Sequence, residues 1–420
     1  MPHGLQRMST VNKVFRKDYL LAVLFLVFIV LVTTCEPPGT ETLTGIMHPA
    51  GLEFAGSETC VQCHSDIAHS FRQTPHFQTS AVASDHTVKG SFDTANNILV
   101  LNERLKIVME KSDTAMYQTA YVGGKQVIQK PLHISLGSGR MGQTYLYWQG
   151  DSLFQLPASY HAASNSWANS PGYSTDRILF DRSITARCLE CHTTYFKAER
   201  LIGEVQTFDK TKSILGVDCE RCHGPAARHV NFHQNHPDET SGKFISEYSS
   251  LTRKQRLDNC ALCHSGIRNN FLPSFSYLAG DDLDRFFFPA ATADSGSSLD
   301  VHGNQTGLLA SSKCFRMSEM DCSTCHDVHA KESKKLELFS ARCMTCHEAG
   351  SDKFCKQTPM PGLVLSKNCI DCHMPALPSK KIFIQSSLSA RPTPFYVRTH
   401  LVATYKKEVE AFLEKLKERN

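Results

Sequence analysis

Apolar residues follow three patterns along the 420-residue chain. An unbroken apolar run covers residues 19–32, directly after the basic residues Lys13, Arg16 and Lys17. Short apolar or alternating stretches lie between residues 97 and 156, and a helical periodicity is clearest near the C-terminus. These patterns predict an export signal, a group of β-strands and a terminal amphipathic helix.

The predicted strands lie in a part of the chain with good turn residues. Gln149, Gly150 and Asp151 separate two apolar stretches and predict a hairpin. We therefore expect a small antiparallel β insertion in the N-terminal half, packed against the rest of the protein; a role in binding a substrate or partner is the alternative. The predicted strands cover residues 97–101, 106–111, 117–122, 144–148 and 152–156.

The terminal helix is predicted over residues 404–419. Val409, Phe412, Leu413 and Leu416 recur at helical spacing, with Lys and Glu between them. Such a helix either caps the body of the protein or binds a partner.

The N-terminal apolar run ends just before Cys35, which follows Thr33 and Thr34. The run is short for a membrane span, and a cysteine in this place resembles a bacterial lipobox, in which the cysteine is lipidated after cleavage. An ordinary cleaved signal and an uncleaved anchor are the alternatives, and all three export the chain. We expect a periplasmic or outer-membrane protein with a lipid anchor at Cys35.

One motif dominates the chemistry of the sequence. Cys-x-x-Cys-His occurs seven times, whereas 17 cysteines and 20 histidines placed at random would give about 0.03 copies. It is the attachment signature of c-type haem, in which both thiols form thioethers and the histidine binds the iron. A zinc half-site or a redox dithiol does not need a histidine after every second cysteine.

We therefore expect seven covalently bound c-type haems, each with one iron. The predicted thioether cysteines are Cys60, Cys63, Cys188, Cys191, Cys219, Cys222, Cys260, Cys263, Cys322, Cys325, Cys343, Cys346, Cys369 and Cys372. The predicted proximal iron ligands are His64, His192, His223, His264, His326, His347 and His373.

Low-spin electron-transfer haems have a second axial ligand, and histidine in that place gives a low potential. His229 and His329 follow a motif too closely to ligate their own iron comfortably, but each can reach a neighbouring haem. The predicted distal ligands are His76, His133, His229, His302, His329 and His400. Six ligands for seven irons leave one to another histidine, to methionine or to a vacant position where a small substrate could bind.

Seven haems would supply much of the buried apolar volume of a chain of this length. We therefore expect a multihaem scaffold that is mostly α, with short helices and long irregular connections besides the β insertion. The expected divisions are a signal peptide (1–34), a tether (35–56), a first haem segment (57–84), a β-rich insertion (85–180), a six-haem domain (181–400) and the C-terminal helix (401–420).

Charge and the remaining cysteines change the picture slightly. The formal net charge of +4 omits the haem propionates, which would add about 14 negative charges if ionised. The mature protein is then acidic, and no basic run or aromatic stripe favours nucleic acid as a partner. Cys314 and Cys355 either form a disulfide or remain two buried thiols.

Several stretches, most specifically the run from Cys314 to His329, resemble the multihaem cytochrome c-552/4 family of the cytochrome c-554 type. That family is related to hydroxylamine oxidoreductase and pentahaem nitrite reductase. The resemblance implies a mostly α scaffold of stacked and perpendicular haem pairs, bis-histidine ligation and electron transfer, with His229 and His329 as distal ligands. The stretches are residues 56–60, 137–146, 170–173, 218–229, 314–329 and 372–375, within roughly residues 56–400.

Two departures bear on catalysis. No motif carries lysine in place of its histidine, as the active site of pentahaem nitrite reductase does, and the cross-linking tyrosine of hydroxylamine oxidoreductase is not identifiable. We expect an electron-transfer protein without catalytic residues, working between redox partner proteins: a membrane donor, and a reductase or extracellular acceptor. The alternative is an oxidoreductase of nitrite, hydroxylamine or tetrathionate at one five-coordinate haem. A structural or haem-scavenging role would require haems that do not exchange electrons rapidly.

Overall fold

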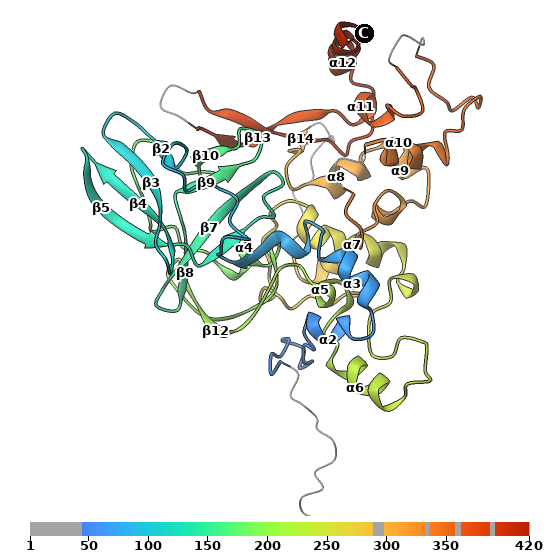
Figure 1. Cartoon of the computed structure of the whole chain (residues 1–420). Helices are drawn as coiled ribbons and strands as arrows, with labels where there is room; N and C mark the ends of the chain where they lie inside the picture. Colours follow the sequence, from blue (N-terminus) through green and yellow to red (C-terminus); the bar gives the residue numbers. More distant parts are fainter. Residues whose placement is uncertain (1–43, 289–297, 333–335, 358–362, 387–390, 420) are drawn as a thin grey trace, which may run out of the picture. The chain divides into compact units, whose positions relative to one another are not determined.

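Most of residues 80–215 form antiparallel β-sheets, in which buried side chains tend to alternate with more exposed ones. The computed structural model describes residues 44–288, 298–332, 336–357, 363–386 and 391–419, which belong to one unit spanning Thr44–Asn420. Within this unit the strands gather on one side, and the short helices that carry the cysteine motifs lie mainly on the other (Figure 1).

A four-stranded meander forms where the sequence predicts strands. It consists of β2 (Ile98–Val100), β3 (Leu105–Lys111), β4 (Met116–Val122) and β5 (Lys125–Pro131). Ile107 and Met109 on β3 and Ala120 on β4 are fully buried, because side chains two residues apart share one face of the sheet. Gly123 and Gly124 both have positive φ in the β4–β5 turn, as this tight hairpin requires.

A second sheet has eight strands and reaches beyond the predicted insertion. Its strands are β1 (Ser80–Val82), β6 (Ile134–Leu136), β7 (Gly142–Gln149), β8 (Ser152–Gln155), β9 (Ala158–His161), β10 (Ser166–Asn169), β11 (Thr193–Ile202) and β12 (Val205–Leu215). The main path runs β1-β6-β7-β8-β12-β11, and β9 pairs with both β7 and β10. The pair Thr207↔Ser152 joins the β11–β12 hairpin to the rest.

Two apolar clusters hold these sheets together. In the first, the Tyr145 and Trp167 rings lie 5.4 Å apart among the side chains of β2, β3 and β7. In the second, Phe54 packs against Tyr195 at 5.1 Å and Tyr195 against Phe275 at 5.6 Å, so segments far apart in sequence meet on the second sheet.

Short helices carry the cysteine motifs or lie in the segments between them. They are α2 (Ser57–Val61), α3 (Ser65–Phe71), α4 (Ala186–Leu189), α5 (Cys219–His223), α6 (Ala227–Asn235), α7 (Arg253–His264), α8 (Gln305–Ala310), α9 (Lys313–Arg316), α10 (Leu336–Met344) and α11 (Cys369–His373). Single turns of 3-10 helix lie at η1 (Phe77–Thr79), η2 (Tyr248–Ser250), η3 (Leu283–Arg285) and η5 (Cys322–Thr324).

The last part of the chain adds a hairpin and a helix. Strands β13 (Ala376–Ile384) and β14 (Thr393–Arg398) pair only with each other in the described part of the chain. Helix α12 (Lys406–Arg419) lies within the segment whose periodicity predicts a helix, and Val409, Phe412, Leu413 and Leu416 are half-buried. Among the described residues, no helix has both the length and the apolar character needed to span a bilayer.

The expected mostly α fold is therefore wrong. The protein is 26% helix and 26% strand, with a large curled antiparallel sheet. The density of motifs correctly favours short helices around the cysteines, but it says nothing about the long intervals between them. Residues 193–215, directly after a motif, form the long β11–β12 hairpin and enlarge what the sequence predicts as a small insertion.

Candidate haem sites

Six of the seven cysteine motifs close on a single helical turn; in the second, the backbone N–H of His192 instead donates to Leu189 at 2.8 Å. The backbone N–H groups of His64, His326 and His347 donate to the carbonyl of the first cysteine of their motif at 2.9, 3.0 and 3.0 Å. Two motifs coincide with α5 and α11, and another ends α7. Residues i, i+3 and i+4 share one face of a helix, so the turn presents both thiols and the imidazole together.

Six of the seven motif histidines direct Nδ1 at an oxygen. With Nδ1–H assigned as the donor, the lone pair of Nε2 is left for a metal, and the second bond fixes the ring orientation. The acceptors are the carbonyls of Ser246 for His223 (2.8 Å), Lys353 for His347 (2.7 Å) and Ala403 for His373 (2.9 Å), Gln305 Oε1 for His264 (3.2 Å), Thr79 Oγ1 for His192 (3.1 Å) and, at 3.4 Å, Glu332 Oε2 for His326.

Four motif histidines face a histidine from elsewhere in the chain. The ring centroids are 6.4 Å apart for His64 and His229, 6.2 Å for His223 and His329, 6.1 Å for His264 and His76, and 6.2 Å for His326 and His400. A metal–imidazole bond is about 2 Å long, as for zinc, and the ring centre lies about 1 Å further, so two imidazoles on one metal have centroids about 6 Å apart. The four pairs therefore fit an iron held between two axial imidazoles.

His302 is near His192, but no ring contact joins them. Burial, followed by the proximity of His302 and His264, lowers the pKa of His192 to about 4. Burial also lowers the pKa of His302. Within the described ranges, no histidine ring lies against His347 or His373.

His133, the sixth predicted distal ligand, lies in a different environment. It precedes β6, its Nδ1 accepts the backbone N–H of Trp148 at 2.9 Å, and burial followed by the charge of Lys210 lowers its pKa. The described contacts of His133 are with the sheet and bring it to no motif histidine. Its role as a ligand stays a prediction.

Burial keeps the facing histidines neutral. It lowers the pKa of His76 and His400 to about 4 and lowers the pKa of His229 and His329 below its usual value. Neutral imidazole is the form that binds iron, because a protonated ring has no free lone pair. The fold thus supplies the required form at neutral pH.

Cysteines of different motifs adjoin one another. The thiols lie close enough to shift each other's pKa in four pairs: Cys60 and Cys219, Cys191 and Cys263, Cys260 and Cys322, and Cys343 and Cys369. Electrostatic contacts of Cys222 with Cys260 and of Cys325 with Cys343 connect the remaining motifs. All seven attachment segments therefore belong to one continuous cluster.

Two acidic residues inside the motifs, Glu190 and Glu220, are buried, and the sequence gives no signal for their role. Glu190 lies between Arg187 (2.8 Å) and Arg221 (3.8 Å) and also accepts the backbone N–H of Phe275 at 2.7 Å. Its carboxylate thus links the second motif to the third and to the segment after the fourth. Only the arrangement in space reveals this.

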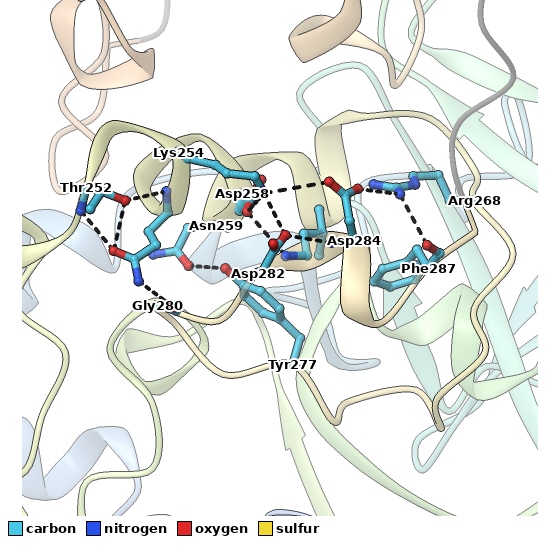
Figure 2. Close-up of polar contacts among 12 residues, drawn as sticks. Thr252, Lys254, Asp258, Asn259, Arg268, Tyr277, Gly280, Asp282, Asp284 and Phe287 are labelled. Carbon is cyan, nitrogen blue, oxygen red and sulfur yellow. Dashed lines mark hydrogen bonds and ion pairs between the residues drawn. The ribbon is translucent and has the colours of Figure 1, made fainter.

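Helix α7 is fastened to the loop that follows it (Figure 2). Lys254 contacts Asp282 at 2.6 Å, and Asn259 accepts the hydroxyl of Tyr277 at 2.7 Å. Thr252 caps the helix through a reciprocal bond with Gln255. These contacts hold the turn that presents His264.

The cysteines outside the motifs differ in position. Cys35 lies outside the described residues. Cys314 is half-buried near Cys325 and Cys343, and Cys355 is exposed near Cys372; both are free thiols in the structure.

Residues 145–224 match the family of cytochrome c554 and c-prime. The chain is also similar to the multihaem cytochrome MtrA of Shewanella baltica, with 26% identity over 44% of this chain and 51% of MtrA. It is a multihaem cytochrome c. The predicted resemblance to cytochrome c-554 is thereby confirmed, and the cytochrome carries covalently bound c-type haem with iron.

Two further comparisons show similarity to other cytochromes. The polyhaem cytochrome OmcC of Geobacter sulfurreducens is 23% identical over 39% of the chain and 20% of OmcC, so the chain spans about half of MtrA and a fifth of OmcC. The crystal structure of the outer cell wall cytochrome OcwA has a TM-score of 0.51 at 17% identity and covers 85% of this chain and 81% of OcwA. This likeness concerns the fold.

Proposed function

We propose that this cytochrome transfers electrons through seven covalently attached haems, one at each motif. The observation that carries the proposal is the continuous cluster of attachment cysteines, because electron transfer needs neighbouring redox centres close together. When bound, c-type haem supplies a one-electron iron couple whose potential the protein tunes.

The axial ligands at five motifs would be histidine pairs. The centroid spacing of 6.1–6.4 Å supports His229, His76, His329 and His400 as partners of His64, His264, His223 and His326, and the proximity of His302 to His192 supports the fifth pair. The assignment of His133 as a further ligand is the weaker part of the proposal, given its bond to Trp148.

Two measurements test this proposal on the exported, haem-loaded protein. Intact mass gives the number of haems, and seven are expected; fewer would remove the corresponding motifs from the proposal. Low-temperature electron paramagnetic resonance then counts low-spin bis-histidine signals, of which at least five are expected. A colourless but folded product would overturn the proposal entirely.

The alternative function is the reduction or oxidation of a small nitrogen or sulfur compound at one five-coordinate haem. The motifs of His347 and His373 are the candidates for a five-coordinate haem, because no histidine ring lies against either of them in the described structure. A high-spin signal that shifts on addition of nitrite, hydroxylamine or tetrathionate would favour catalysis. Low-spin signals from every haem, unchanged by these compounds, would favour an electron carrier.

The partners would be a membrane donor and a reductase or an extracellular acceptor. We propose export to the periplasm or outer membrane with a lipid at Cys35, as the sequence around that cysteine suggests. Mass analysis of the mature N-terminal peptide tests this: a lipidated Cys35 supports the anchor, and an unmodified N-terminus at another residue contradicts it.

A further inference from the structure

His326 faces a charged acceptor, unlike the other motif histidines with a partner at Nδ1. Five of them direct Nδ1 at a backbone carbonyl, an amide oxygen or a hydroxyl, all of which are neutral. Nδ1 of His326 instead lies 3.4 Å from Oε2 of Glu332. The carboxylate belongs to the segment that follows the same motif.

Glu332 is held in this position by two further hydrogen bonds. Its other oxygen, Oε1, accepts Nη2–H of Arg342 at 2.5 Å and the backbone N–H of Asp327 at 3.1 Å. The side chain is only 10% exposed, so water screens its charge weakly. Both bonds occupy Oε1 and leave Oε2 turned toward the imidazole.

Arg342 fixes this arrangement from the next motif. It lies on α10, directly before Cys343, and also donates to the carbonyl of Cys325. Its guanidinium pairs directly with Oε1 of Glu332 at 2.5 Å and offsets part of the carboxylate charge, while Oε2 is the oxygen that lies 3.4 Å from Nδ1 of His326. The contact between Glu332 and His326 is therefore built into the junction of two attachment segments.

We propose that Glu332 is a tuning residue: it accepts Nδ1–H of His326 and lowers the reduction potential of the haem attached at Cys322 and Cys325. This rests on the proposed haem attachment at that motif. A hydrogen bond to an ionised acceptor is roughly twice as strong as one to a neutral acceptor, and it makes the imidazole a more basic ligand. A more basic ligand stabilises ferric over ferrous iron, which lowers the potential.

The position of this motif gives the tuning a functional consequence. Cys322 adjoins Cys260 of the fourth motif, and Cys325 adjoins Cys343 of the sixth. The fifth motif thus connects the N-terminal group of motifs with the last two. By lowering the potential at this junction, Glu332 would set the barrier to electron exchange between the two groups.

Potentiometric titration of the full haem-loaded protein tests the inference, with each haem followed by its spectrum. The component that becomes high-spin in His400→Ala identifies the haem at His326. In Glu332→Gln, which keeps an oxygen for Arg342 and Asp327, that component is expected to move to higher potential while the others stay in place. Asp327→Asn is the matched control, because it removes one charge beside the same histidine without touching Nδ1.

Two results would overturn the tuning role: unchanged potentials in Glu332→Gln, or a shift no larger than in Asp327→Asn. If Glu332→Gln does not load haem, Glu332→Asp keeps the charge and withdraws it from the ring, and a smaller upward shift is expected; no shift there also overturns the role. A wild-type protein that lacks haem at the fifth motif by peptide mass would instead contradict the proposed function.

Discussion

The carboxylate of Glu220 accepts the backbone N–H of Ala55 at 2.7 Å, which ties the third motif to the segment that leads into the first. The same carboxylate accepts the N–H groups of Gly56 and Ala226, both at 2.8 Å. Burial raises the pKa of Glu220, and these three bonds counter the rise. A side chain inside a haem motif thus also serves as a structural clamp.

Replacing Glu220 should therefore destabilise the folded protein. Glu220→Ala leaves the N–H groups of buried Ala55 and Ala226 and of half-buried Gly56 without this acceptor, and it is expected to lower the free energy of unfolding by about 2–4 kcal/mol. Chemical denaturation followed by circular dichroism measures this. Glu58→Ala is the control, because its ion pair with Arg72 is 83% exposed on the glutamate side and is worth at most about 1 kcal/mol. Equal losses in the two variants would contradict the clamp.

His229→Ala should convert one haem from low-spin to high-spin, because it removes the ring that faces His64 at 6.4 Å. Electron paramagnetic resonance of the oxidised protein is the measurement. His233→Ala is the matched control: its ring lies 4.5 Å from that of His229 but faces no motif histidine in the described structure. An unchanged low-spin count in His229→Ala would show that another group ligates that iron.

His48 should make stability fall at mildly acidic pH. Its side chain is buried, Nδ1 accepts the N–H of Ala50, and burial followed by the charge of Arg221 lowers its pKa from 6.5 to about 4. The unfolded chain binds a proton below pH 6.5 that the folded protein takes up only near pH 4. The stability that neutral His48 supports is thus complete above about pH 6.5 and is lost as the pH falls through this window.

His48→Asn, which keeps an acceptor for Ala50, should therefore show a smaller drop in melting temperature between pH 7.5 and pH 5 than the wild type. His86→Asn, at an exposed position, should leave the wild-type pH dependence intact. A drop of wild-type size in His48→Asn would assign the acid sensitivity to other groups.

Gly90→Ala should destabilise the strand-rich part of the protein, since an added methyl group would overlap the buried indole of Trp167. Overpacking of this kind costs about 1–3 kcal/mol. Thermal unfolding measures the loss, and the low-spin haem signals at 25 °C should not change. In a Trp167→Phe background, which provides space, Gly90→Ala should cost less; an equal cost in both backgrounds would exclude the overlap as the cause.

Local signals predict part of this fold well. Alternation and turn residues indicate the strands around Ile107 and Ala120 and the hairpin at Gly150, because both patterns act within a few residues. They miss β11 and β12 after His192, where bulges interrupt the alternation. The mostly α expectation is wrong for a related reason: haem volume constrains the residues near a motif and leaves the intervals between motifs free.

At the candidate sites, too, the sequence predicts what neighbouring residues determine and misses what depends on distant segments. The motif itself predicts the thiols and proximal histidines, while position just after a motif singles out His229 and His329. The structure brings both against motif histidines, but it leaves His133 at the sheet. The roles of Glu220 and Glu332 are invisible in the sequence, because each depends on a partner that only the folded chain supplies.

The pairing of His64 with His229 also bears on how the protein is made. Under the proposed export the chain emerges from its N-terminus, so residue 64 would reach the outside well before residue 229. During that interval the first cofactor would be attached but would lack its opposite ligand, and this temporarily open iron would need protection from stray oxidants and ligands. The rate of translocation would then limit damage to the haem at the first motif, because its iron gains a second ligand only after the segment behind the third motif has been exported.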